Sequence, residues 1–242
     1  MCGRVVFTGV TDDVIHEFRV GRVSPDLPEP SWNVPPTRMI PLLLESPRAP
    51  GERRLEAARW GLTPPFSPTI STKYPTFNAR IESAAEKTSF APALGKHRCA
   101  ILVDGYYEWH GEGAARTPAY FSLPGEPMLL AGLYGWWRDP AAPADWHLTA
   151  TMLTTAATGD LERIHHRMPV FLPPAEREAW LDPDQHGGRP MLDRLAAAAA
   201  GEASRVRFHP VRPLRGDGPE LIEPLPADGP GQLPDTLDWP HA

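Results

Sequence analysis

The sequence predicts an α+β protein with a single domain, built on a largely antiparallel, curved or barrel-like β-sheet with short flanking helices. Three observations support this class. The 242 residues include 31 prolines, which interrupt long helices and favour short strands joined by rigid loops. Apolar residues make up 41% of the chain, which is enough to fill a core. The predicted elements follow no regular alternation of strand and helix, unlike a doubly wound parallel sheet.

In the first third of the chain, strands and turns dominate the prediction. Arg4–Gly9 is a predicted strand, and Thr11 is a suitable N-cap for a short helix with Val14, Ile15 and Phe18 on one face. The next expected elements are a loop at Pro25–Pro36, strands at Met39–Leu44 and Leu55–Trp60, a Pro-rich connection at Thr63–Pro75 and a mostly helical segment at Asn78–Ser89.

The remainder of the chain is predicted to complete the sheet. A buried strand at Cys99–Val103 runs into Asp104-Gly105, and Tyr106–Trp109 continues it before a turn at His110. Further expected strands are Tyr120–Leu123, Met128–Leu133, His147–Thr154, Met168–Leu172 and Arg205–Pro210, with helices at Pro174–Leu181 and Met191–Ala199. We expect one domain over residues 1–224, followed by a flexible, acidic, Pro- and Gly-rich tail at 225–242.

The net charge of −6 belongs entirely to the C-terminal part. Residues 216–242 hold six acidic residues and neither Lys nor Arg, so residues 1–215 balance 24 basic groups against 24 acidic ones. Between residues 71 and 100, five Lys and Arg oppose two Glu, a local charge of +3. This segment permits contact with phosphate, although a solvated charged helix gives the same count.

Cysteine use and hydropathy limit the cellular setting. Cys2 and Cys99 are too few for a disulfide framework and lack the CxxC spacing of zinc and redox motifs. The first twenty residues lack the basic and apolar regions of a signal peptide, and no apolar run reaches about 18 residues. We expect a soluble cytoplasmic protein, a monomer without a membrane partner, and the sequence indicates no metal or other cofactor.

Cys2 is the residue with the most distinctive chemistry. Cysteine is small enough to allow removal of the initiator methionine, which leaves an amine and a thiol on adjacent carbons. Such a 1,2-aminothiol condenses with an aldehyde to an imine and then closes the thiol onto the same carbon, forming a thiazolidine. Ordinary pKa values of about 7.7–8.0 for the amine and about 8.5 for the thiol make both groups usable near neutral pH. The alternative is a small apolar residue at the start of a strand.

Asn78 and Arg80 follow the Pro-rich connection, and each has two interpretations. Asn78 is either an N-cap of the predicted helix or a side chain that fixes a substrate or the terminal amine. Arg80 either reaches a phosphate or forms an ion pair with Glu108 or Glu82. Local sequence does not separate these alternatives.

Glu108 lies among large aromatic residues. Strand alternation places Tyr107 and Trp109 on one face and Tyr106 and Glu108 on the other. Glu108 is then either a partly buried carboxyl with a raised pKa, suited to acid–base chemistry, or an exposed residue on a half-solvated strand.

His165 and His166 are adjacent in an extended segment, which is expected to point them to opposite faces and disfavours a shared metal. One of them can transfer protons near pH 7, and the alternative is an ordinary loop histidine.

Six motifs occur in a fixed order: Met-Cys-Gly-Arg at the start, Trp32-Asn-Val-Pro-Pro-Thr, Trp60-Gly-Leu, Asn78-Ala-Arg-Ile-Glu, Asp104-Gly-Tyr-Tyr-Glu-Trp and Ile164-His-His-Arg-Met-Pro. Over about Cys2 to Pro224, the chain resembles the SOS-response-associated peptidase family. The resemblance implies a DNA-damage protein that binds single-stranded DNA at abasic sites and forms a thiazolidine crosslink with the ring-opened sugar aldehyde. It also implies removal of Met1, either by the domain itself or by an aminopeptidase.

The resemblance assigns catalytic roles residue by residue. Cys2 matches the nucleophile, and Asn78, Glu108 and His165 match the surrounding catalytic set. In this assignment Glu108 relays protons during imine formation, and His165 assists opening of the cyclic sugar. Asn78 holds the amine or thiol in place.

The DNA contacts implied by the resemblance are Arg4, Arg80, Phe66 and Lys87. Arg4 and Arg80 match positions that contact backbone phosphate near the lesion. Family members often carry two bulky aromatics in the loop after Trp-Gly, whereas Phe66 is the single aromatic in the corresponding stretch here. Thr88 replaces a frequent basic residue, and Lys87 is adjacent to it.

Two other functions would use overlapping residues. An N-terminal-nucleophile hydrolase acting on peptides or amides in trans would use Cys2 with Glu108 and His165. A non-covalent single-strand-binding module would need no thiol. Substitution of Cys2 by Ser or Ala distinguishes both from a crosslinking enzyme.

Overall fold

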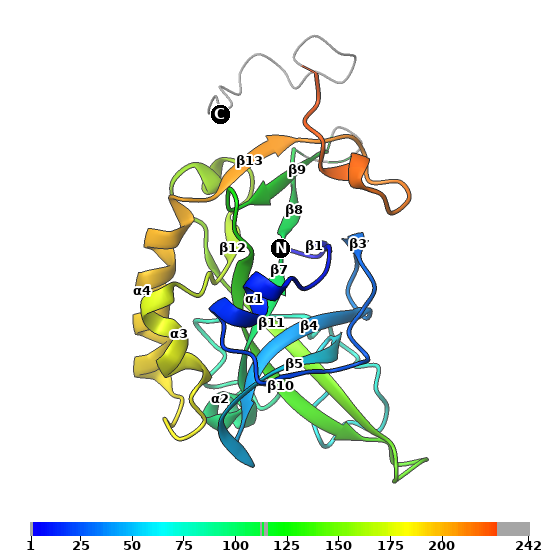
Figure 1. Ribbon diagram of the computed structural model, residues 1–242, viewed down its shortest axis with the longest axis vertical. Helices are drawn as coiled ribbons and strands as arrows, with labels where there is room; N and C mark the ends of the chain where they lie inside the picture. Colours follow the sequence, from blue (N-terminus) through cyan, green and yellow to red (C-terminus); the bar gives the residue numbers. More distant parts are fainter. Residues whose placement is uncertain (1, 112, 114–115, 227–242) are drawn as a thin grey trace.

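A computed structural model describes residues 2–111, 113 and 116–226, and its ribbon is shown in Figure 1. The strands are β1 (Val5–Phe7), β2 (Arg22–Val23), β3 (Ser31–Val34), β4 (Met39–Ser46), β5 (Ala49–Trp60), β6 (Asn78–Arg80), β7 (Arg98–Val103), β8 (Gly105–His110), β9 (Thr117–Ser122), β10 (Met128–Arg138), β11 (Trp146–Ala156), β12 (Arg167–Pro169) and β13 (Arg207–Pro210). The helices are α1 (Asp12–Glu17), α2 (Ala91–Lys96), α3 (Pro174–Leu181) and α4 (Arg189–Ala203). The predicted α+β class with a largely antiparallel sheet is confirmed.

A closed barrel forms the centre of the protein. Its strands follow the order β4, β5, β11, β10 and β7, and β7 returns to pair with β4. The pairing between β11 and β5 is parallel and covers Thr149–Arg59 and Ala150–Trp60, whereas the other pairs in the ring are antiparallel. A second sheet, ordered β13, β9, β8, β1 and β3, lies beyond one end of this barrel (Figure 1).

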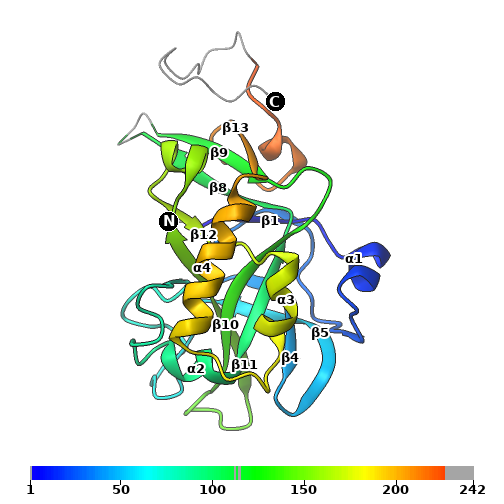
Figure 2. The same ribbon diagram turned by 90° about the vertical axis from the view of Figure 1, so that its left-hand side faces the viewer.

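Strand alternation divides the core into an inner and an outer layer. Side chains such as Leu42, Ile101 and Met152 point into the barrel, where they belong to one buried cluster. Their sequence neighbours Leu43 and Leu102 belong to a second cluster with apolar residues of α3 and α4. Figure 2 shows these two helices along one side of the barrel. The inner layer therefore has two ends, which we call mouths, and one of them faces the second sheet.

The sequence prediction fails in two segments. Asn78–Ser89 is not a helix, because Asn78–Arg80 pairs in parallel with β11 and residues 81–90 form turns. An available edge on β11 outweighs the local helix propensity. Pro25–Pro36 is not wholly a loop, since it contains β3, which pairs with β1. In contrast, the Thr11 N-cap is confirmed by a bond of 3.4 Å from the Val14 N–H.

Gly105 is required where β7 passes into β8. A Cβ atom at this position would collide with the Phe121 carbonyl and the Tyr120 ring. The close approach draws β8 against β9 and sets the position of Glu108, three residues further along the strand.

The predicted tail lies outside the described residues from position 227 onward. At its start, the Leu225 N–H donates a hydrogen bond of 3.0 Å to the Pro210 carbonyl. Within the described part of the chain, no helix is both long and apolar enough to cross a membrane.

Candidate active site

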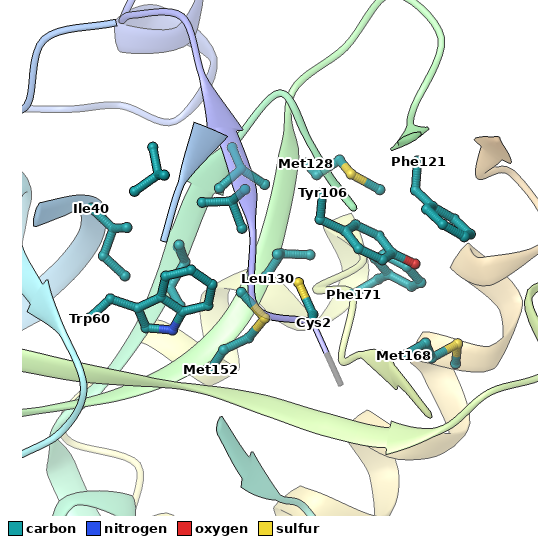
Figure 3. Close-up of a cluster of buried hydrophobic side chains, with 14 of the residues drawn as sticks. Cys2, Ile40, Trp60, Tyr106, Phe121, Met128, Leu130, Met152, Met168 and Phe171 are labelled. Atoms are coloured by element: carbon teal, nitrogen blue, oxygen red, sulfur yellow. The ribbon is translucent and has the colours of Figure 1, made fainter. Parts of the chain in front are cut away.

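Cys2 lies at one mouth of the barrel. Val5 pairs with Tyr106, and the Tyr107 N–H donates a bond of 2.9 Å to the Arg4 carbonyl, so β1 and β8 place Cys2 beside Glu108. Cys2 is 1% exposed and belongs to the inner core cluster. Figure 3 shows its sulfur pointing among Trp60, Leu130 and Met152. We call this end of the barrel the Cys2 mouth.

The Cys2 thiol is uncharged in this environment. Burial and, secondarily, the nearby Glu108 carboxyl raise the pKa of the thiol well above its ordinary value. Its polar contact is weak, a distance of 3.9 Å from Sγ to the Arg4 carbonyl oxygen. A thiol held in this way is a poor nucleophile until a neighbouring base takes its proton.

Asn78 contacts the backbone of Cys2. Its Nδ2 donates a hydrogen bond of 2.6 Å to the Cys2 carbonyl oxygen. The Trp60 indole N–H donates a bond of 2.9 Å to the Phe77 carbonyl, which fixes the chain directly before Asn78. Because Asn78 lies in a strand, the N-cap alternative is wrong. Its Oδ1 atom is buried and has no hydrogen-bond partner among the described residues.

Glu108 and His165 approach Cys2 from different elements. Glu108 is 2% exposed, so the buried alternative is correct, and burial raises the pKa of its carboxyl. The His165 Nδ1 atom lies 3.9 Å from Glu108 Oε1. Burial lowers the pKa of the His165 imidazole. Each shift favours the uncharged form of its group, and a carboxyl with a raised pKa is suited to take up and release protons.

The backbone of Arg167 orients the His165 ring. The His165 Nδ1 atom lies 3.0 Å from the Arg167 backbone nitrogen and 3.1 Å from the Arg167 carbonyl oxygen, so it accepts from the N–H in one tautomer and donates to the carbonyl in the other. The expectation that the two histidines point to opposite faces is wrong, because the His165 and His166 rings stack with centroids 4.3 Å apart. The turn that follows residues 159–163 brings both rings to one side.

An ion pair joins two of the six motifs. The buried Arg167 guanidinium binds both carboxylate oxygens of Glu82, at 2.7 and 3.0 Å, and also the Thr154 carbonyl at 2.7 Å. Glu82 therefore pairs with Arg167 rather than with Arg80. This contact ties the segment that carries Asn78 to the segment that carries His165.

Arg4 and Arg80 flank the Cys2 mouth, and they differ in their contacts: Arg4 is hydrogen-bonded to a neighbouring side chain, whereas Arg80 is exposed. The Arg4 guanidinium donates a bond of 2.7 Å to Asn33, and the Asn33 amide donates one of 2.9 Å to the Gly216 carbonyl. Asp217 continues this chain of contacts by accepting the Trp32 N–H at 2.6 Å. Arg80 is exposed and lies on the same face of β6 as Asn78.

Phe66 and Lys87 are exposed but lie in loop and turn segments, and no contact among the described residues joins them to Cys2. Tyr74, in the same connection as Phe66, is also strongly exposed, and Lys73 lies 5.5 Å from its ring centroid. Sequence reasoning missed Tyr74 because nothing local distinguishes an exposed tyrosine from a buried one.

Two basic residues have roles that the sequence did not indicate. Arg98, counted within the +3 segment, is buried and donates to five backbone carbonyls, so it cannot reach phosphate. Arg116 is close enough to Glu108 and His165 for its positive charge to oppose protonation of both.

Among the described residues, no group of three or more His, Cys, Asp or Glu side chains could hold a metal.

This fold and site define a class of barrel-like α+β protein in which a buried thiol meets an amide, a carboxyl and an imidazole at one barrel mouth. The sequence profile of the SOS response associated peptidase (SRAP) family matches residues 1–215. The chain belongs to this family.

Curated relatives extend over most of the chain. It is 31% identical to the abasic site processing protein YoqW of Bacillus subtilis over 227 residues, which cover 92% of this chain and 99% of the relative. It is 29% identical to the abasic site processing protein YedK of Escherichia coli, with 93% and 100% covered. A solved structure of a protein from Bacteroides thetaiotaomicron has the same fold, with a TM-score of 0.74 at 22% identity, covering 93% of this chain and all of that one.

Proposed function

We propose that this protein binds single-stranded DNA at abasic sites and forms a covalent thiazolidine adduct through a mature N-terminal Cys2. The observation that carries the proposal is the convergence of Asn78, Glu108 and His165 on Cys2. The relatives are named abasic site processing proteins. The ring-opened sugar of an abasic site carries the aldehyde that an aminothiol requires.

The proposed reaction has two bond-forming steps. The terminal amine attacks C1 of the ring-opened sugar, and loss of one water gives an imine. The thiol sulfur then adds to the imine carbon, and the proton from sulfur passes to nitrogen. The net change is one water lost, with no oxidation or reduction.

Each polar group has a role that follows from its surroundings. Glu108, whose pKa is raised by burial, accepts the proton of the terminal ammonium and returns protons as water leaves. His165, oriented at Nδ1 by the Arg167 backbone, donates a ring proton to the sugar ring oxygen as the ring opens. Asn78 holds the Cys2 carbonyl and so fixes the amine and thiol relative to the sugar.

Arg4 and Arg80 would bind backbone phosphates next to the lesion, and Phe66 would stack on a flanking base, with Lys87 as a further phosphate contact. The arginine held by Asn33 would act as a fixed contact, whereas the exposed Arg80 would adapt to the strand. Contacts of this type bind the backbone without reading sequence.

Exposure of the aminothiol requires that Met1 be removed. Hydrolysis of the bond between Met1 and Cys2 consumes one water and yields free methionine and the new amine. Glu108 and His165 could activate that water in the domain itself. A protein purified from cells that lack methionine aminopeptidase activity would retain Met1 if the domain did not catalyse this step.

The test is to mix mature protein with a single-stranded oligonucleotide that carries one abasic site. We expect a species that survives denaturing electrophoresis, with an intact mass equal to protein plus oligonucleotide minus one water. An oligonucleotide without the lesion is the control and should give no such species. If the mature protein leaves the lesion-bearing strand unmodified, the proposal is wrong.

Variants of Cys2 separate the alternatives. Cys2→Ala should abolish the adduct, and full protection of the lesion by this variant would instead favour non-covalent binding. Cys2→Ser should not form a stable adduct, whereas hydrolysis of peptide or amide substrates by the unaltered protein would favour a trans-acting hydrolase.

A further inference from the structure

The barrel has a second mouth at the end opposite Cys2. Met152 lies at the Cys2 mouth and Trp146 at the other end of the same strand, six residues and about 20 Å away. A pocket of about 780 Å³ opens at this second end, within the size range of small-molecule sites. Residues of its wall include Ser46, Arg54, His97, Tyr134, Trp136 and Trp146. We call this end the far mouth.

The register of β10 and β11 builds an aromatic platform at the far mouth. Trp136 pairs with Leu148 and Arg138 with Trp146, so the two tryptophans are diagonal neighbours on one face of the hairpin. Leu148 belongs to the inner core cluster, which shows that this face continues the inside of the barrel. Trp136 is 48% exposed and Trp146 is 55% exposed. The hairpin projects at the lower right in Figure 1.

Exposed indoles at this site are suited to stacking rather than to core packing. The Arg138 guanidinium lies over the Trp146 ring, 5.9 Å from its centroid, and so contacts one of its faces. Planar rings with cations beside them bind the π-faces of nucleobases in single-strand-binding proteins. Contiguous exposed apolar surface of this kind often marks an interaction site.

The polar groups of the pocket suit an anion with hydrogen-bonding edges. Arg48 and Arg54 line it, and none of the lining residues in the described part of the chain is acidic. Arg54 donates to Glu52 through Nη2 at 2.7 Å, while its buried Nε has no partner among the described residues. His97 packs against Tyr134 with ring centroids 5.1 Å apart and ring planes tilted by 60°, and burial lowers its pKa, which favours the neutral ring that can both donate and accept.

We propose that the far mouth is a nucleotide site, in which Trp136 and Trp146 stack on a nucleobase and Arg48 and Arg54 bind its phosphate. The ligand that the site recognises is a nucleobase with an attached phosphate. A free mononucleotide and a single DNA strand both carry these groups. This site is separate from the Cys2 mouth and needs no covalent chemistry.

The experiment uses the full chain with Cys2→Ala, so that no adduct forms and failure of the crosslinking proposal leaves the result unaffected. Deoxyadenosine monophosphate and an undamaged single-stranded oligonucleotide are titrated separately by calorimetry and indole fluorescence. We expect saturable binding with indole quenching, and a roughly tenfold loss of affinity in Trp136→Ala or Trp146→Ala. Trp136→Phe keeps a ring and should retain most of the affinity.

Arg54→Ala should weaken binding and reduce its salt dependence, while Arg194→Ala, which removes an exposed cation on α4, should change neither. Competition between the two probes would assign the site to the DNA strand, and simultaneous binding would assign it to a free nucleotide. Absence of saturable binding by both probes, or affinities unchanged in the tryptophan variants with circular dichroism confirming the fold, would overturn the inference.

Discussion

The two mouths of one barrel differ in almost every physical property. At the Cys2 mouth the Cys2 thiol and the Glu108 carboxyl are buried, Asn78 is hydrogen-bonded to the Cys2 carbonyl, and the pKa values of Cys2, Glu108 and His165 are shifted by burial. At the far mouth the large side chains are open, and Trp136 and Trp146 keep about half of their surface in water. Buried, interlinked groups suit bond formation, whereas open aromatic surfaces suit reversible binding.

Under the two proposals, one scaffold would separate reaction at the Cys2 mouth from binding at the far mouth. Strand pairing holds Asn78 in β6 and Glu108 in β8, and Cys2 lies three residues before the start of β1. The far mouth instead uses hairpin ends, where side chains have room to adapt. Variants that change one mouth without the other test whether this separation is real.

Glu108→Gln should have the largest effect and should be confined to the Cys2 mouth. The amide keeps the shape of the carboxyl but cannot accept the ammonium proton, so adduct formation should slow by about 10²–10⁴-fold. The measurement is the rate of appearance of the denaturation-resistant species. Glu17→Gln, which alters an exposed carboxylate paired with Arg177, is the matched control and should leave the rate unchanged.

A loss of less than about tenfold in Glu108→Gln would remove Glu108 from the acid–base role. Nucleotide binding at the far mouth should be the same in this variant as in the unaltered chain. A parallel loss at both mouths would mean that the two sites are coupled through the barrel.

Glu82→Gln should disturb the Cys2 mouth indirectly, by weakening the Glu82–Arg167 ion pair that joins the segments of Asn78 and His165. The buried Arg167 loses a charged, bidentate acceptor, which we expect to lower the free energy of unfolding by about 1–2 kcal/mol, with Glu82 half in water. Adduct formation should also slow, because Asn78 and His165 lie on the two segments that this pair joins. Glu86→Gln, in the same turn region and exposed, is the control for chemical denaturation and for the rate.

Sequence motifs predicted the Cys2 mouth better than the far mouth, and the reason is physical. Reactive groups such as Glu108 and His165 belong to rare local combinations that can be recognised along the chain. Trp136 and Trp146 are ordinary residues of strands, and their position at a barrel mouth depends on the long-range pairing of β5 with β11.

The same reasoning explains the elements that sequence analysis missed. The closed barrel depends on one short parallel pairing, between β5 and β11, which the hydrophobic periodicity of the sequence does not predict. Asn78–Ser89 has the composition of a helix, but β11 offers its first three residues a strand partner. Local propensity predicts an element only where no tertiary contact competes with it.

Phe66→Ala and Tyr74→Ala test the connection between β5 and β6, which joins the regions of the two mouths. Each exposed ring should contribute about 1 kcal/mol to non-covalent binding of single-stranded DNA through stacking, at the lower end for a loop residue. Affinity measured by fluorescence anisotropy with Cys2→Ala protein should fall severalfold in each variant. Unchanged affinity in both would exclude this connection from the DNA interface.

The smallest expected effect is a pH-dependent gain of stability in Glu108→Gln. Burial raises the pKa of the Glu108 carboxyl above 4.5, so the folded protein keeps a proton that the unfolded chain has released. The stability contributed by protonated Glu108 is complete below pH 4.5 and is lost as the pH rises through the folded-state value. Glutamine cannot ionise, so the variant escapes this loss.

Thermal unfolding of both proteins from pH 4 to pH 8 measures this difference. The variant should unfold at a higher temperature at pH 8, by about 2–4 °C for each kcal/mol, and the two proteins should converge toward pH 4. The lowered pKa of His165 affects stability in the opposite direction, because the contribution of His165 to stability rises with pH up to about 6.5. This contribution is present in both proteins, so it largely cancels from the difference between them. A difference that is constant with pH would show that burial does not raise the pKa of Glu108, and the contrast between buried ionisable groups at the Cys2 mouth and open side chains at the far mouth would fail.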